Sequence, residues 1–210
     1  MDGLLFDTER LSFDTFTQAA REVGWTASKD AFVASMGMPR TKIPEKLTEV
    51  LGSGFPALQV VDRSYELLEE VIERDGPPVK DGVESMLNAL DHRGIRSVVA
   101  TSTDTDAAMR YLRMAGIIER FEGVIGGDQI ERGKPSPDIF LHAAESLESE
   151  PTRTLVFEDS RIGVQAAIAA GARVVMIPDF MEPTEELRHR IFAVLPSLEE
   201  AARRADYLLS

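Results

Sequence analysis

The sequence contains no cysteine. Disulfides, thiolate metal sites and a cysteine nucleophile are therefore excluded together, and any catalytic group must come from oxygen or nitrogen side chains. Histidine is also scarce, because only His92, His142 and His189 are present and they are scattered along the chain. A bound metal ion would accordingly be held by oxygen atoms, a donor set that favours Mg²⁺ over zinc.

Positive charge is in short supply as well. The chain has 23 basic and 36 acidic residues and a formal net charge of −13, with no lysine and arginine cluster to offset that charge locally. Such a chain repels nucleic acid and anionic lipid surfaces, so we expect neither nucleic acid nor membrane as a partner.

Long apolar runs are missing too. The longest weakly polar stretch, from Ala166 to Pro178, is broken by Gly171 and Arg173 and is too short to span a bilayer. The N-terminus does not show a basic segment followed by an apolar one, as an export signal would. We therefore expect a soluble, cytoplasmic and monomeric protein.

The chain does have the means to build a core, since 43% of its 210 residues are hydrophobic. From Lys80 onward, short apolar runs alternate with amphipathic helical stretches that close on glycine. This alternation predicts an α/β fold, a Rossmann-like three-layer core with a parallel sheet covered on both faces. The expected strands are 97–100, 123–125, 154–157, 174–177 and 193–195, and the expected helices are 83–93, 106–115, 137–147, 163–170 and one capped by Ser197.

The stretch from Glu9 to Gly76 has helical periodicity nearly throughout and no convincing strand. Breaks at Gly24, at 37–39 and at 52–56 divide it into about four helices, which would pack as a small bundle. Residues 1–8 and 80–210 are therefore predicted to form the α/β core, and residues 9–79 an inserted helical cap.

Ligands of open parallel sheets bind beyond the carboxyl ends of the strands, so the residues that follow the strands are the candidates for chemistry. Thr101 and Ser102 follow one strand and could hold an anion, although ordinary helix capping explains them about as well. Lys134 is placed rigidly before Pro135, but it could also be an ordinary surface lysine.

The strongest of these candidates is the pair Glu158 and Asp159, directly after a predicted buried strand. Two adjacent carboxylates repel each other unless a cation or a basic group lies between them. In the alternative, Asp159 only caps the next helix, but this does not explain why a second carboxylate, Glu158, stands beside it. We therefore interpret the pair as a Mg²⁺ site.

Taken together, these segments resemble the haloacid dehalogenase superfamily, in its phosphatase and β-phosphoglucomutase-like branch with a helical cap. The resemblance covers nearly the whole chain. It rests on D-G-x-x-x-D-T-E at 2–9, a hydroxyl at a strand end (Thr101), G-K-P-x-P-D at 133–138 and E-D-S-x-x-G-V-x-A-A at 158–167.

The resemblance implies Mg²⁺-dependent transfer of a phosphoryl group from a small phosphorylated substrate through an aspartyl-phosphate. Asp2 would be the general acid and then the general base, and its main-chain carbonyl would reach the metal. Thr101 and the Ser102 N–H would hold the phosphoryl oxygens, while Lys134 would offset their charge. Glu158 and Asp159 would complete the metal site.

The family motif begins D-x-D-G, so its nucleophilic aspartate would lie two residues before Asp2 and outside the printed chain. The apolar first strand of the core, which leads into that motif, is then missing as well. We favour a longer, active enzyme whose start lies upstream of Met1. The rival interpretation is a non-catalytic relative that binds phosphate esters.

The segment Gly37, Met38, Pro39, Arg40 resembles a cap segment that reaches the substrate, and Arg40 could grip an anionic group or stay solvated. In the β-phosphoglucomutase branch a cap histidine and a tryptophan would stand where this chain has Ser12 and Phe16. Because Ser12 cannot act as a cationic trigger, we expect hydrolysis of a sugar phosphate or nucleotide-like monoester. A mutase remains the alternative.

Overall fold

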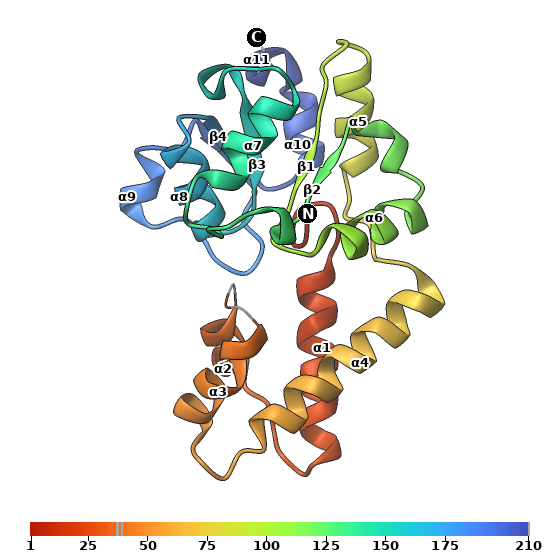
Figure 1. Ribbon diagram of the computed structural model, residues 1–210, viewed down its shortest axis with the longest axis vertical. Helices are drawn as coiled ribbons and strands as arrows, with labels where there is room; N and C mark the ends of the chain where they lie inside the picture. The colour runs from red at the N-terminus through yellow and green to blue at the C-terminus, as the bar shows by residue number, and fades with distance from the viewer. Residues whose placement is uncertain (37, 39, 210) are drawn as a thin grey trace. The chain divides into compact units, whose positions relative to one another are not determined.

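The protein is described by a computed structural model that covers residues 1–36, 38 and 40–209. The chain divides into two compact units, one of Met1–Phe6 with Val79–Ser210 and the other of Asp7–Pro78. We call them the α/β unit and the helical unit, and each is described by itself (Figure 1). The predicted α/β core, 1–8 and 80–210, and the predicted cap, 9–79, differ from these units by one or two residues at each boundary.

The helical unit contains the four helices that the periodicity predicts, with a short 3₁₀ turn at Arg40–Lys42. α1 packs against α4, and α2 packs against α3. Apolar side chains spaced at helical intervals form the core of the unit, and among them Phe16, Leu47 and Val60 are buried. The helices are α1 (Thr8–Glu22), α2 (Lys29–Ser35), α3 (Ile43–Leu51) and α4 (Ala57–Asp75).

The α/β unit confirms the predicted alternation of strands and helices. The strands are β1 (Val99–Ala100), β2 (Val124–Ile125), β3 (Leu155–Glu158), β4 (Arg173–Met176) and β5 (Ala193–Val194). The helices are α5 (Val83–Asp91), α6 (Thr105–Met114), α7 (Asp138–Ser146), α8 (Arg161–Ala169), α9 (Glu185–Arg188), α10 (Leu198–Arg203) and α11 (Ala205–Leu208). Two of them, α9 and α11, were not expected from the sequence, because each is too short to show a helical period.

All the strand pairs are parallel, as predicted, but they form two separate sheets: β1 pairs with β2, and β4 lies between β3 and β5. Among the described residues no strand joins β1 to β3. The two strands instead line a cavity of about 460 Å³, which residues of α5 and α7 also border.

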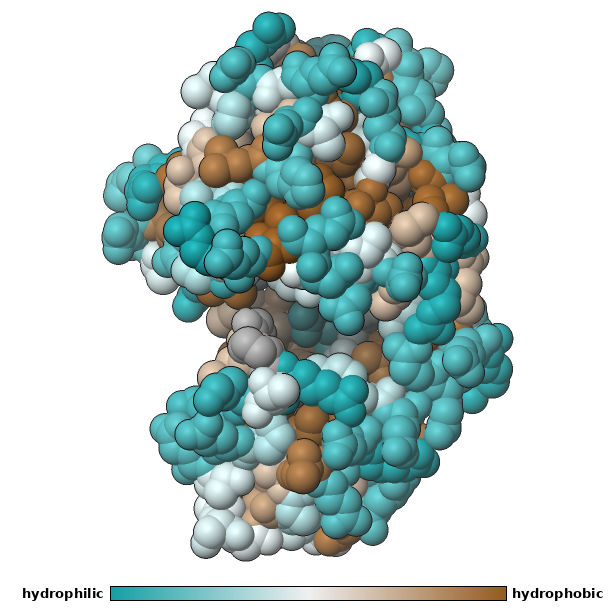
Figure 2. Space-filling model, in the orientation of Figure 1, coloured by the Kyte–Doolittle hydropathy of each residue, from teal (hydrophilic) through white to brown (hydrophobic). Residues whose placement is uncertain are grey.

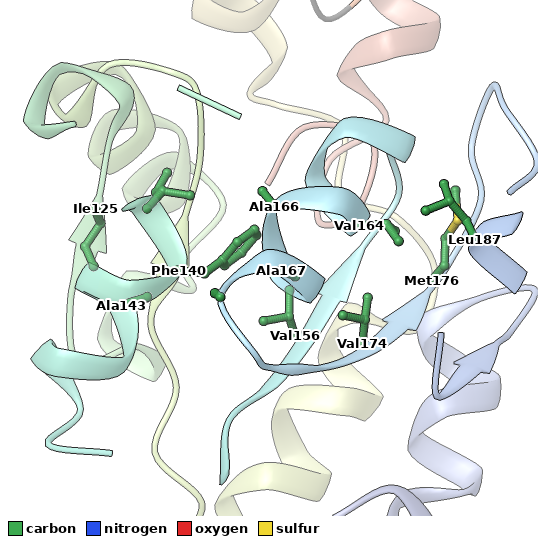
Figure 3. Packing of buried hydrophobic residues seen from close by; sticks show 12 residues of the cluster. Ile125, Phe140, Ala143, Val156, Val164, Ala166, Ala167, Val174, Met176 and Leu187 are labelled. Carbon is green, nitrogen blue, oxygen red and sulfur yellow. The ribbon is translucent and has the colours of Figure 1, made fainter. Parts of the chain in front are cut away.

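An apolar cluster of the α/β unit lies between helices α7 and α8 and strands β3 and β4. Phe140 of α7 points toward Ala166 and Ala167 of α8, while Val156 and Val174 extend from the strands (Figure 3). All five of these side chains are buried. The small side chains of α8 let the helix lie close to the sheet, so the carboxyl end of β3 and the start of α8 are held firmly together.

The surface shown in Figure 2 is mostly hydrophilic, with apolar residues gathered toward the middle of the visible face of the α/β unit. Within the described part of the chain, every helix is too short or too polar to cross a lipid bilayer.

The packing of the helical unit predicts the effect of a core deletion. Leu47 is completely buried, so Leu47→Ala should lower the free energy of unfolding by about 2 to 5 kcal/mol through lost transfer energy and a cavity. Urea unfolding followed by the fluorescence of Trp25, the single tryptophan and a member of this unit, measures the loss. Leu58→Ala, at a site 64% exposed, is the matched control and should change the energy little. Equal effects of the two variants would contradict this packing.

Candidate active site

Glu158 is the last residue of β3, and its carboxylate is almost completely enclosed. Its Oε2 accepts hydrogen bonds from the backbone N–H groups of Asp159 and Ser160, both at 2.9 Å, and from the Ser160 hydroxyl at 3.0 Å. Ser160 also caps helix α8 by accepting from the Gly163 N–H at 3.1 Å. A Cβ atom at position 163 would collide with the Glu158 carboxylate, so only glycine permits this close approach.

The other carboxylate oxygen of Glu158, Oε1, contacts the ammonium group of Lys134. The two side chains are only 8% and 6% exposed, and the Lys134 Nζ lies 4.9 Å from the centre of the Phe140 ring. Burial favours the protonated acid, but the Lys134 ammonium, together with the N-terminal ammonium and the hydrogen bonds from Lys134 and Ser160, outweighs burial and lowers the pKa of Glu158 to about 2. The motif lysine is therefore a buried partner of the first motif carboxylate and not a surface lysine.

Asp159 has the opposite electrostatic situation. Burial and the neighbouring Glu158 carboxylate raise the pKa of Asp159 well above its usual range. Its carboxylate lies against the N-terminal turn, because a Cβ atom added to Gly3 would collide with Asp159 Oδ2. Ionised Asp159 is thus a half-buried charge that a cation would stabilise.

The N-terminal turn brings Asp2 to the carboxyl end of β1. The turn is closed by hydrogen bonds from the Gly3 N–H to the Phe6 carbonyl, at 2.9 Å, and from the Leu5 N–H to the Met1 carbonyl, at 2.7 Å. The Asp2 carboxylate accepts hydrogen bonds from the hydroxyls of Thr103, at 2.8 Å, and Thr101, at 3.4 Å. Its oxygen is therefore oriented by the strand end.

Thr101 directly follows β1 and is 3% exposed, with its N–H bonded to the Ile125 carbonyl at 3.0 Å. Its hydroxyl also accepts from the Thr103 N–H at 3.2 Å. Ser102 is exposed, so the two residues predicted to hold phosphoryl oxygens differ in burial. Contacts from Thr101 to Asp2, from Gly3 to Asp159 and from Glu158 to Lys134 place the predicted residues of the α/β unit in one neighbourhood.

The donor set of this neighbourhood fits Mg²⁺. All the candidate side-chain ligands are oxygen atoms, and burial and the neighbouring Glu158 carboxylate raise the pKa of Asp159, so its ionised form would gain from a bound cation. No group of three or more acidic, histidine or cysteine side chains converges anywhere in the part of the chain that the structure describes. A Mg²⁺ ion here would thus depend on few carboxylates together with main-chain and water oxygens, as Mg²⁺ sites commonly do.

Arg40 belongs to the helical unit. Its guanidinium donates a hydrogen bond to Asp62 Oδ1 at 2.8 Å and stacks on the Tyr65 ring, 4.3 Å from the centroid. Gly37 and Pro39, which complete the predicted substrate segment, lie outside the described residues. The structure therefore describes Arg40 as a paired, half-exposed side chain.

The structure also describes Ser12 and Phe16, the two positions of the helical unit at which the sequence differs from the mutase pattern. Phe16 is buried in the core of the unit, and its ring lies 5.8 Å from that of Phe32. Ser12 lines a small cavity of about 60 Å³.

The structure adds three residues to the site that the sequence did not assign to it. Thr103 was recognised only as one of a run of hydroxyls, and its bond to Asp2 depends on how the turn folds back. Lys80 donates to the Gly3 carbonyl at 2.8 Å and pairs with Asp179 at 3.0 Å. Asp179 follows β4, so the strand-end rule applied to that strand could have found it.

The Lys134–Glu158 contact predicts a pH-dependent loss of stability. The lowered pKa of Glu158 means that its ionised form stabilises the fold above about pH 4.5 and that this contribution is lost as the pH falls toward 2. Lys134→Met should therefore reduce the free energy of unfolding by about 3 kcal/mol at pH 7, because it leaves an unpaired buried carboxylate, and by less at pH 4. Urea unfolding followed by circular dichroism measures both values.

The double variant Lys134→Met with Glu158→Gln is the control for this prediction, since it removes the unpaired charge. It should recover much of the lost stability at pH 7. A loss that is the same at both pH values, or that the second substitution does not relieve, would argue against a charge pair.

For Asp159 we expect the opposite dependence of stability on pH. A carboxyl group whose pKa is raised in the folded state loses its stabilising contribution as the pH rises through that pKa, so ionised Asp159 destabilises the fold near neutrality. Without divalent cations, Asp159→Asn should raise the midpoint of thermal unfolding at pH 7.5 by about 2 to 4 °C or more and have little effect at pH 4.

The same variant should remove stabilisation by Mg²⁺, because the cation loses a ligand charge. Thermal unfolding with 10-fold steps of MgCl₂ measures this loss, and Asp14→Asn, at an exposed position, is the control. A midpoint that Mg²⁺ raises equally in both variants would contradict a metal site at Asp159.

Comparison with known proteins gives a consistent picture. The family model described as haloacid dehalogenase-like hydrolase matches residues 1–177. The chain is 33% identical to a phosphorylated carbohydrates phosphatase of Thermotoga maritima over 174 residues, covering 81% of this chain and 79% of that protein. It is 30% identical to protein CbbY of Rhodobacter capsulatus over 216 residues, covering 98% and 94%.

A solved structure agrees with these matches. A candidate β-phosphoglucomutase from Thermotoga maritima superimposes with a TM-score of 0.80 at 29% identity, covering 100% of this chain and 97% of that one. The fold, the order of the motifs and the extent of these matches coincide, and the chain belongs to the haloacid dehalogenase-like hydrolase family.

Proposed function

We propose that this protein is a Mg²⁺-dependent phosphatase that hydrolyses a small phosphorylated metabolite through an aspartyl-phosphate. The observation that carries the proposal is that two sets of polar side chains lie close together at the carboxyl ends of the strands. An Asp2 carboxylate oriented by threonine hydroxyls lies near a cluster of the buried Lys134–Glu158 pair and the half-buried Asp159. The first can move protons, and the second can hold a cation and offset phosphate charge.

Asp2 is the general acid and then the general base. Its Oδ2 accepts from Thr103 at 2.8 Å, which holds the carboxyl in one rotamer near the site where the leaving oxygen would sit. In the first half of the reaction it protonates the leaving oxygen, and in the second half it takes a proton from the attacking water. A carboxyl group that is already held in the reactive position speeds proton transfer, because its side chain does not have to rotate first.

Lys134 offsets the negative charge of the transferring phosphoryl group. Its pairing with Glu158 keeps the ammonium at one place, and burial strengthens its electrostatic effect because little water screens it. Glu158 has hydrogen bonds to Ser160 and the Asp159 N–H on its other oxygen, so we assign it mainly to orienting Lys134 and the start of α8. Thr101 and the Ser102 N–H hold the phosphoryl oxygens.

Asp159 and the main-chain carbonyl of Asp2 are the groups that would hold Mg²⁺. When bound, the ion would neutralise phosphate charge and orient the phosphoryl group for in-line transfer. The raised pKa of Asp159 supports this assignment, because a half-buried carboxylate beside another carboxylate is stabilised by a cation.

The nucleophilic aspartate that the family resemblance calls for would lie two residues before Asp2. The cavity of about 460 Å³ between β1 and β3 supports this part of the proposal, since a strand leading to such a residue would pair with both and fill it. Its apolar lining includes Val99, Leu155 and Phe140, which suits an apolar strand.

The substrate class we propose is a sugar phosphate or a nucleotide-like monoester. The similarity to a phosphatase named for phosphorylated carbohydrates supports the first choice. Arg40, held by Asp62 and Tyr65 in the helical unit, is the residue we assign to the part of the substrate away from the reacting phosphate.

The proposal is tested by measuring release of inorganic phosphate from a set of sugar phosphates and nucleoside monophosphates. Two forms are compared: the chain that starts at Met1, and the same chain preceded by any residues that its reading frame encodes upstream. Turnover that requires Mg²⁺ and stops with a chelator supports the proposal. A comparison of the two forms locates the nucleophile, and absence of turnover in both would overturn the proposal.

Hydrolysis, and not isomerisation, is the expected outcome with β-glucose 1-phosphate and a bisphosphate primer. Ser12 carries no charge that could time the engagement of Asp2, so water is free to attack the intermediate. We expect inorganic phosphate to exceed glucose 6-phosphate at least about 10-fold, because isomerisation demands that water be excluded. Both products are followed in one reaction, with chelator-treated protein as the blank, and predominant glucose 6-phosphate would favour the mutase.

A further inference from the structure

Lys80 makes two polar contacts that tie distant parts of the chain to the N-terminal turn. Its Nζ donates a hydrogen bond to the Gly3 carbonyl at 2.8 Å and forms an ion pair with Asp179 Oδ1 at 3.0 Å. The Lys80 and Asp179 side chains are 23% and 17% exposed, so solvent screens the pair much less than a surface pair. The Lys80 N–H adds a bond to the Leu5 carbonyl at 2.9 Å.

Two carboxylates lie close to Gly3. It has a φ of +72°, and an added Cβ would collide with Asp159 Oδ2 and come within 3.4 Å of Asp179 Oδ2. Asp179 Oδ2 is buried and accepts no hydrogen bond from any described residue. The Gly3 carbonyl oxygen is partly negative and would be repelled by the two nearby carboxylates. The Lys80 ammonium counters that repulsion.

The turn held in this way carries Asp2. The Asp2 carboxylate is fixed on one side by Thr103, and the Gly3 carbonyl, one peptide further on, is fixed by Lys80. If the turn had only its own backbone hydrogen bonds, the plane of the Asp2–Gly3 peptide could tilt by small changes in the φ and ψ angles on either side of it. Displacement of a reacting group by about 1 Å is enough to slow an enzyme about 100-fold, so both attachments bear on catalysis.

We propose that Lys80 and Asp179 are positioning residues that hold the Asp2–Gly3 turn in place for proton transfer by Asp2. The inference rests on the proposed phosphatase function. Neither side chain touches the reacting atoms in this account: Lys80 acts through the Gly3 carbonyl, and Asp179 acts by orienting and neutralising Lys80.

The test uses Lys80→Met and Asp179→Asn in whichever form of the protein turns over in the phosphatase assay. Lys80→Met should lower kcat about 10- to 100-fold with KM changed less than about 3-fold, because the acid/base group is misplaced while the phosphate-binding groups stay intact. Asp179→Asn should act in the same direction but less. Lys80→Arg keeps the charge and should recover most of the lost kcat.

Lys46→Met is the matched control. Lys46 forms an ion pair with Glu49 at the same distance, 3.0 Å, with a similar exposed fraction of 30%, but it lies in helix α3 of the helical unit. It should change kcat less than about 2-fold, as a surface pair contributes little.

Hydrogen exchange supplies a readout that does not depend on turnover. The amides of residues 3–6 should exchange at least about 10-fold faster in Lys80→Met, while those of α8 keep their protection. Unchanged exchange in residues 3–6 would overturn the proposal, and so would faster exchange with an unchanged kcat. If the unaltered protein has no turnover, the phosphatase proposal fails, and the exchange measurement alone decides whether the pair holds the turn.

Discussion

The contact between Lys134 and Glu158 is the interaction on which the arrangement of the site depends. Glu158 ends β3, bonds to the first N–H groups after the strand and lies against Gly163 of α8. Lys134 comes from the loop before α7 and reaches the same carboxylate. One buried pair therefore joins a strand end to two helices, and the apolar packing of Phe140 against α8 surrounds it (Figure 3).

The cost of burying that pair explains the density of hydrogen bonds around it. A buried ion pair offsets its desolvation only when its remaining lone pairs are satisfied. Glu158 receives three further hydrogen bonds, all from Asp159 and Ser160. The geometry needed for stability thus also keeps the Lys134 ammonium in one place, which is what its proposed role beside a phosphate requires.

Charge balance links the rest of the site to this pair. Lys134 neutralises Glu158, while burial and the neighbouring Glu158 carboxylate keep the pKa of Asp159 raised. Lys80 neutralises Asp179, which also lies close to Gly3. Asp159 is the carboxylate with the least compensation, which is the property expected of a cation ligand.

The sequence by itself determined the secondary structure, the parallel strands and the motif residues, because these follow from local periodicity, glycine stops and chemistry at strand ends. It did not predict that the strands would form two separate sheets, β1 with β2 and β3 with β4 and β5. Short helices such as α9 escaped prediction, since four residues are too few to show a period.

Only the tertiary structure decided which side chains meet. Thr103 bonds to Asp2 because the N-terminal turn folds back onto the end of β1. Lys80 meets Asp179, 99 residues further along the chain, because the loop after β4 and the return from the helical unit converge on Gly3. Such contacts join segments whose separation in sequence carries no periodic signal, so their pairing depends on packing and charge balance in the folded chain.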